Sequence, residues 1–213
     1  MPVLSDIAFG RPPNLTHCMR MLDRFGMVQF ARGATPDLHF GYCLDDNARA
    51  FLAAVMTLYL DPQNTDARKF GDAALTFMEA CRRPDGRFHN LMDSNGAFID
   101  EVGSPDSLGR LAWACGVAVR TAPVSEWRDR SRTLLLAALE HVEALHTLHP
   151  VSYAILGLAA AVAPEAAAPL PPLESPLTQD DISRLKHVLE RHTELLAAAL
   201  EANSLPGWEW FES

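Results

Sequence analysis

Positive charge is scarce in this chain, and no apolar run is long enough to span a bilayer. Its 18 Lys and Arg against 27 Asp and Glu give a formal net charge of −9. Nucleic-acid binding requires clustered cations that displace counterions from the phosphates, so this balance argues against a nucleic-acid partner. The longest apolar run, residues 151–163, is about two-thirds of the length that a membrane helix needs. We therefore expect no nucleic-acid partner and no membrane span.

Cysteines are few and widely separated. None of them forms a CxxC pair, and the four are Cys18, Cys43, Cys81 and Cys115. Residues 1–13 lack the basic start and apolar core of a secretory signal. Widely spaced thiols in apolar surroundings are typical of a reduced cytosolic protein. The sequence therefore predicts a cytoplasmic protein without disulfides.

Signatures of metals and cofactors are also missing. The chain has no Gly-rich phosphate loop and no GxSxG nucleophile motif. His146 and His149 are three residues apart, but no third ligand with zinc-like spacing accompanies them. We expect no cofactor and no metal site.

Two kinds of helical segment alternate along the chain. Some carry apolar residues at the i, i+3, i+4 spacing of a one-sided amphipathic helix: residues 70–81, 134–145 and 182–199. Others are apolar on all sides and require cover all round: residues 48–60, 111–119 and 151–163. This alternation is typical of an outer ring of helices packed around an inner ring. The sequence predicts one all-α domain over residues 1–213, an α/α toroid or a part of one.

Polar or turn-forming residues precede each segment that is apolar on all sides. They are Asp45-Asp46-Asn47, residues 103–107 and residues 149–152. If the inner helices run parallel, these three starts meet at one end of the ring. The positive ends of their dipoles then favour carboxylates and hydroxyl-rich groups at a common funnel mouth.

Two further regions lack a helical pattern. Residues 87–91 and 97–101 flank a turn-forming Asn95-Gly96, which predicts a short β-hairpin over the funnel mouth. Residues 164–176 are too rich in proline to continue a helix. We therefore expect residues 164–180 to be a loop within the single domain.

Three segments resemble the six-hairpin glycosidase-like α/α toroid family of bacteria, which often occurs beside or fused to glycosyltransferases. The segments are LDRFGMVQFARGATPDLHFGYCLDDNARA (22–50), RFHNLMDSNGAFIDEVGSPDSLGRLAWACG (87–116) and GWEWFES (207–213). The resemblance implies an (α/α)6 toroid with a carbohydrate-facing funnel, and glycan processing or binding. It settles no particular reaction, because folds of this kind host many activities.

The resemblance also implies an incomplete ring. In the family, the toroid continues beyond the tryptophan-rich segment with a second helix start that contains Asn-Ala-Arg. At roughly 25 to 30 residues for a helix and its connection, this chain supplies about seven or eight helices of the twelve in a closed double ring. We therefore expect a C-terminally truncated member, or a half that a homodimer or a partner chain completes.

Asp45 and Asp46 are the first candidate catalytic residues. They lie in GYCLDDNARA (41–50), which is more polar than one helix cap requires. Paired carboxylates beside an apolar wall can hold different pKa values and divide acid and base duties. The alternative is that one of them caps the helix and the other is solvated, with Arg49 holding either in place.

Glu101 and Asp106 form a second acidic group, at the end of the expected hairpin and the start of the next apolar helix. In glycosidases the separation of two carboxylates decides between retention and inversion. The alternative is that Ser104 or Asp106 caps the helix, while Glu101 is a solvated loop charge. Arg110 is then a structural partner of Asp106 at the i, i+4 spacing.

Aromatic and hydrogen-bonding residues accompany these acidic groups, and such side chains suit the apolar faces and hydroxyl groups of sugars. The candidate substrate-binding residues are Gln29, Tyr42, Asn47, Arg49, Asn90, Arg110 and Trp208. Trp113, inside an apolar helix, is expected in the core. The leading interpretation is a glycoside hydrolase-like, carbohydrate-active domain that processes an oligosaccharide or glycoconjugate. The alternative is a non-catalytic glycan-binding or scaffolding domain that works with a glycosyltransferase.

Overall fold

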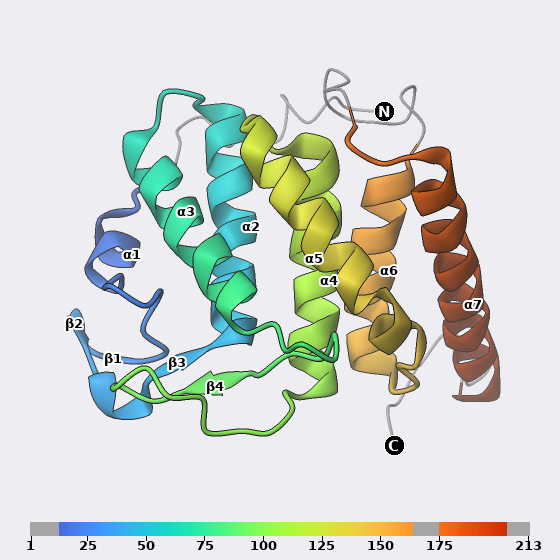
Figure 1. Ribbon diagram of the computed structural model, residues 1–213, viewed down its shortest axis with the longest axis horizontal. Coiled ribbons are helices and arrows are strands. Elements are labelled where there is room, and N and C mark those ends of the chain that lie inside the picture. Colours follow the sequence, from blue (N-terminus) through green and yellow to red (C-terminus); the bar gives the residue numbers. More distant parts are fainter. Residues whose placement is uncertain (1–12, 164–174, 204–213) are drawn as a thin grey trace.

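The computed structural model describes residues 13–163 and 175–203, which are mostly helical and form two layers of helices (Figure 1). One layer contains α2 (Leu44–Leu60), α4 (Pro105–Thr121) and α6 (Leu148–Val162). The other contains α3 (Thr65–Ala80), α5 (Ser125–Glu143) and α7 (Gln179–Asn203). Each helix of the first layer packs against the helix that follows it, and α4 lies between α2 and α6. The all-α prediction is confirmed.

Short elements decorate one end of the layers. A short helix, α1 (Thr16–Arg20), comes first, followed by β1 (Ala31–Arg32), which pairs with β2 (Thr35–Pro36). A 3-10 turn, η2 (Leu38–Phe40), leads into β3 (Tyr42–Cys43), which pairs antiparallel with β4 (Leu91–Met92). The loops between these elements lie at the end where α2 and α4 begin (Figure 1).

The expected hairpin over residues 87–101 is present only in part. A bridge between Met92 and Phe98 closes the turn around Asn95-Gly96, and the Asp93 N–H donates to the Ala97 carbonyl at 2.9 Å. The regular strand partner of β4, however, is β3 and not residues 97–101. The sequence identified the turn but could not show that a segment 50 residues upstream pairs with the strand.

Local signals explain where the long helices begin. Asn64 accepts a hydrogen bond from the Ala67 N–H at 2.9 Å and caps α3. Ser104 accepts from the Ser107 N–H at 3.2 Å, with Pro105 in the first helical position of α4. In α2 the cap is Cys43, whose sulfur accepts from the Asp46 N–H at 3.3 Å. Neither aspartate is therefore the cap of α2.

Small residues bring the helices of the first layer into close contact. A Cβ atom at Gly116 of α4 would overlap the carbonyl of Gly157 of α6, and one at Gly157 would overlap the carbonyl of Ala112. In the second layer, the indole of Trp127 occupies the space beside Gly71 and is fully buried. Its Nε1 donates to Asp72 at 2.6 Å, so the buried polar atom is satisfied.

The described helices cover only one side of the first layer. We call the other side the open face. It consists of Arg49, Ala53, Met56 and Leu60 of α2, Arg110, Trp113 and Val117 of α4, and Tyr153, Leu156 and Ala160 of α6. These residues recur at helical spacing, and Arg110 and Trp113 contact Tyr153 across the helices. The prediction that all three helices are covered all round is therefore wrong for the described part of the chain.

The proline-rich region lies mostly outside the described residues, which resume at residue 175. Helix α7 begins at Gln179, slightly before the expected end of the loop at residue 180. No helix within the described ranges is long and apolar enough to cross a membrane.

Candidate functional site

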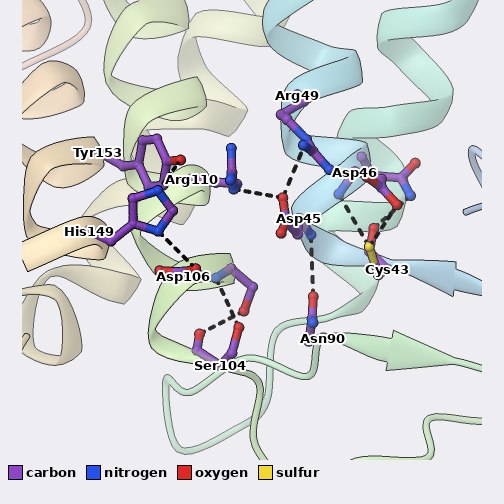
Figure 2. A network of polar contacts seen from close by, with 12 residues as sticks. Cys43, Asp45, Asp46, Arg49, Asn90, Ser104, Asp106, Arg110, His149 and Tyr153 are labelled. Carbon is purple, nitrogen blue, oxygen red and sulfur yellow. Dashed lines mark hydrogen bonds and ion pairs between the residues drawn. The ribbon is translucent and has the colours of Figure 1, made fainter. Parts of the chain in front are cut away.

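The three helices of the first layer run parallel, and their starting ends lie at the same end of the molecule (Figure 1). Side chains from these ends contact one another and form the head network, which Figure 2 shows. Its members are Asp45 of α2, Asp106 and Arg110 of α4, and His149 and Tyr153 of α6. The sequence pattern predicted that the three polar starts would meet in a parallel arrangement, and the network joins all three.

Arg110 links α4 to both neighbours. Its Nε lies 2.8 Å from Oδ1 of Asp45, and its guanidinium carbon lies 4.2 Å from the centre of the Tyr153 ring. The Asp45 and Arg110 atoms are both buried, yet the N–H is not aligned for a hydrogen bond, so the contact is an ion pair. Arg49 lies 3.4 Å from the same carboxylate oxygen. The main-chain N–H of Asp45 donates to Asn90 at 3.3 Å.

The carboxyl group of Asp45 has a pKa above its ordinary value. Burial is the largest cause, because it penalises the charged form. Arg49 and Arg110 oppose the shift, while the negative charges of Asp46 and Asp106 reinforce it. Asp45 thus holds its proton to a higher pH than a free aspartate, which is the property that a general acid requires.

Asp106 makes its contact with α6 and not with its own helix. Its carboxylate lies 3.1 Å from Nδ1 of His149, whose Nε2 lies 2.7 Å from the Tyr153 hydroxyl. Both ring nitrogens of His149 are therefore engaged. The alternative in which Arg110 pairs with Asp106 is wrong in this structure, because Arg110 reaches across to Asp45 on α2.

An aromatic pair lies next to the network on the open face. The Trp113 and Tyr153 rings are nearly parallel, with centroids 5.7 Å apart and an interplanar angle of 8°. Trp113 is partly exposed, which corrects the expectation that it is a core residue. Apolar ring faces beside carboxylates are a typical environment for a sugar ring.

Asp46 is held at the first turn of α2 by two contacts. The Cys43 thiol donates to its carboxylate at 3.0 Å, and Arg49 forms an ion pair with it. Burial raises the pKa of the Cys43 thiol, so this group keeps the proton that it donates. Arg49 contacts both Asp45 and Asp46 and therefore couples them electrostatically.

Two expected substrate-binding residues are core residues in the structure. Tyr42 is buried, and its hydroxyl donates to Asp23. Asn47 is fully buried and joins the loop before β1 to α2: its Oδ1 accepts from the Met27 N–H at 2.9 Å, and its Nδ2 donates to the Cys43 carbonyl at 3.0 Å. The structure therefore places Tyr42 and Asn47 in the core and not on the surface beside the head network.

Glu101 does not join the head network among the described residues. Its side chain is exposed, and its carbonyl accepts a hydrogen bond from Arg83 at 2.6 Å. The neighbouring Asp100 has a structural role that the sequence did not indicate, because its carboxylate accepts from the main-chain N–H groups of Asn90 and Leu91 at 2.6 and 3.1 Å. Among the described residues, the Glu101 side chain therefore makes no contact with Asp45 or Asp106.

The remaining candidates have different placements. Asn90 contacts the network through the backbone of Asp45. Gln29 is partly buried, and its main-chain N–H donates to the Gly41 carbonyl at 2.9 Å. Trp208 lies outside the described residues. His149 and Tyr153 were missed as site residues, although His149 is the first residue of the polar start 149–152 and Tyr153 follows it at the i, i+4 spacing that places both on one face.

The network lies at the end of the open face where α2, α4 and α6 begin. A cavity of about 140 Å³ lies near the start of α4, but its lining residues, among them Phe88, Leu108 and His141, do not belong to the network. Within residues 13–163 and 175–203, no group of three or more His, Cys, Asp or Glu is arranged to hold a metal ion. Comparisons of the chain with models of protein families, with curated proteins and with solved structures give no match.

Proposed function

We propose that this chain is a glycoside hydrolase-like, carbohydrate-active domain that processes an oligosaccharide or glycoconjugate at the head network. The observation that carries the proposal is the placement of two carboxyl groups with different environments on neighbouring parallel helices. Burial raises the pKa of Asp45, while Asp106 is more exposed and contacts His149. In glycosidases, two carboxyl groups in different environments have different pKa values, so that one acts as the acid and the other as the base or nucleophile.

The residues around the two carboxyl groups suit this chemistry. Asp45 is the proposed acid that protonates the leaving oxygen, and Asp106 is the proposed base or nucleophile on the opposite side of the bond. The Trp113 and Tyr153 rings offer a surface for the C–H face of a sugar. Arg49 and Asn90 hold Asp45 from two directions and limit its movement.

The proposed architecture is an α/α toroid of which this chain supplies an arc. The open face supports it, because the exposed fractions of Met56, Leu60 and Leu156 are 44%, 51% and 50%. Three helices of 15 to 17 residues, about 25 Å long and about 9 Å apart, present roughly 700 Å². Covering this face with a second copy or a partner chain buries roughly 1,400 Å² in total, the size of a specific interface. Light-scattering mass across a dilution series tests completion by a second copy, for which a dimer is expected.

Non-catalytic glycan binding is the second candidate, and a specific observation favours it. Asp45 is already engaged by Arg49 and Arg110, so its carboxyl group is less free to transfer a proton to a substrate. The network can still bind a glycan for a glycosyltransferase without cleaving it. Binding without product formation distinguishes this candidate from the enzyme.

The experiment is incubation of the purified full chain with a panel of manno- and gluco-oligosaccharides, with and without inorganic phosphate, followed by product analysis. We expect a cleaved product with the wild type and loss of it in Asp45→Asn and in Asp106→Asn. Asp129→Asn is the matched control, because Asp129 is an exposed residue of α5 and its carboxylate makes no ion pair among the described residues. Unchanged turnover in both site variants would overturn the assignment of the carboxyl groups. Absence of both product and binding would overturn the carbohydrate proposal.

A further inference from the structure

His192 is an ionisable residue on the buried side of α7, far along the chain from the head network. The buried residues of α7 are Asp181, Leu185, Val188 and His192, which recur every three or four positions and face α5 and α6. The imidazole is fully buried, and its Nε2 lies 2.9 Å from the Val142 carbonyl at the end of α5. Because a carbonyl only accepts, Nε2 carries the proton of the neutral ring.

The other ring nitrogen of His192 has no partner. Nδ1 is buried and makes no hydrogen bond within the described part of the chain. In the neutral imidazole this nitrogen is an acceptor, and leaving it unpaired costs little compared with burying a charge. In the protonated ring it becomes a donor, and a buried cationic donor without an acceptor is strongly unfavourable.

The charged groups around His192 do not remove this penalty. Glu143 of α5 favours the protonated form, but it is engaged by Arg191 at 3.1 Å and lies 3.8 Å from His187. Arg191 of α7 disfavours the protonated form. The titratable residues of α6 are His149 and Tyr153, which belong to the head network, and the connection between α5 and α6 contributes His146. Burial is the largest cause that holds the pKa of His192 below its ordinary value of 6.5.

The two halves of α7 are anchored differently. The first half is held by Arg132, whose Nε and Nη2 lie 2.9 and 2.7 Å from the Asp181 carboxylate. Thr178 adds a reciprocal cap: its N–H donates to the Asp181 carboxylate at 2.9 Å, and its hydroxyl accepts from the Asp181 N–H at 3.2 Å. Burial alone would raise the pKa of Asp181, but the hydrogen bonds from Thr178 and Arg132 together keep it below its ordinary value, so these contacts persist in mild acid. Beyond Val188, His192 is the only described residue of α7 that is buried.

We propose that His192 is a pH-sensitive latch: protonation of its buried Nδ1 in mild acid releases residues 189–203 of α7 from α5 and α6, while the first half stays docked. Because α7 runs antiparallel to α6, the released half lies beside the start of α6 (Figure 1). That start carries His149 and Tyr153, so opening the latch uncovers the helix that supports one side of the head network. The proposal does not depend on what the network binds.

Hydrogen exchange of the full chain between pH 7.5 and pH 5, corrected for intrinsic exchange rates, tests the latch. Protection of residues 189–203 is expected to fall by up to about tenfold per pH unit as the pH drops below 6.5, the ordinary pKa that His192 regains on release, and to level off below the lower pKa of folded His192, with residues 179–187 unchanged. In His192→Gln the expected loss of protection disappears, because the amide can donate to the Val142 carbonyl and does not titrate. His187→Gln is the matched control and behaves as the wild type, since His187 is 73% exposed on the same helix.

A second measurement keeps the test decisive if His192→Gln does not fold. An NMR titration of wild-type imidazole resonances is expected to show His192 protonating below pH 6.5, together with loss of protection in residues 189–203. The latch is overturned if His192 titrates at or above pH 6.5 with protection unchanged. It is also overturned if both halves of α7 lose protection together, because the release is then not local.

Discussion

The two sides of the α2–α4–α6 layer differ in what their residues contact. On the covered side, Phe51 and Leu111 are fully buried, and Trp127 packs closely against Gly71 of α3. On the open face, Met56 and Leu156 are about half exposed, and the polar residues gather at one end. The packing of the described helices therefore accounts for the residues of the covered side, but it does not account for the residues of the open face.

This difference has an energetic consequence. Apolar surface left in water forgoes about 25 cal/mol per Å², so an exposed stripe along parallel helices is a cost that a monomer does not recover. The charged residues of the head network lie at one end of the same face, where the ion pair between Asp45 and Arg110 offsets part of their desolvation. Substitutions on the two sides should accordingly have effects of very different size.

The largest effect is expected from a substitution between α4 and α6. Gly116→Val places atoms where the Gly157 carbonyl lies, so the helices must separate along their length. We expect a loss of about 4 kcal/mol or more in the free energy of unfolding, measured by urea denaturation. Ala53→Val on the open face is the matched control and should change stability by less than about 1 kcal/mol. Equal effects of the two variants would contradict the distinction between the two sides.

A smaller effect is expected from breaking the link between α2 and α4 in the head network. Arg110→Leu leaves the Asp45 carboxylate without its nearest cation and should cost about 1 to 3 kcal/mol at pH 7. The double variant with Asp45→Asn should recover part of that loss, because no unpaired charge remains. A double-mutant cycle by urea denaturation measures the coupling. Additive losses would show that the ion pair contributes no coupling energy.

The sequence predicted the helices and the polar residues at their starts because helical periodicity and capping are local properties, whereas the parallel direction of α2, α4 and α6 entered only as a condition. It predicted less about the partners of long side chains. Arg110 is four residues from Asp106 in sequence, yet it pairs with Asp45 because the packing of α2 against α4 brings that carboxylate closer. The burial of Asn47 and the capping of α2 by Cys43 likewise depend on the position of the preceding loop. The open face was unpredictable for a related reason: a helix that is apolar all round shows that cover is needed but not which side receives it.

The raised pKa of Asp45 predicts a modest pH dependence of stability. Because the folded state binds this proton more tightly than the unfolded state, the contribution of Asp45 is greatest below the unfolded value of 3.8 and is lost as pH rises through the folded pKa. As the pH rises over that interval, the free energy of unfolding of the wild type should therefore fall relative to that of Asp45→Asn, by about 1 kcal/mol or less. Urea denaturation from pH 3 to pH 7 measures the shift. If the wild type instead becomes more stable relative to Asp45→Asn as the pH rises, Arg49 and Arg110 lower the pKa of Asp45 by more than burial raises it.

The smallest effect on the isolated chain is expected on the open face. Leu156→Ala removes atoms that already contact water, so the free energy of unfolding of a dilute monomer should change by less than about 1 kcal/mol. If a second copy covers this face, the same substitution acts on association: the dimer should dissociate at a higher concentration, which sedimentation at several concentrations measures. Ala137→Ser, on α5 away from the open face, should leave association unchanged. A large loss of stability at high dilution would instead show that Leu156 packs against part of the same chain.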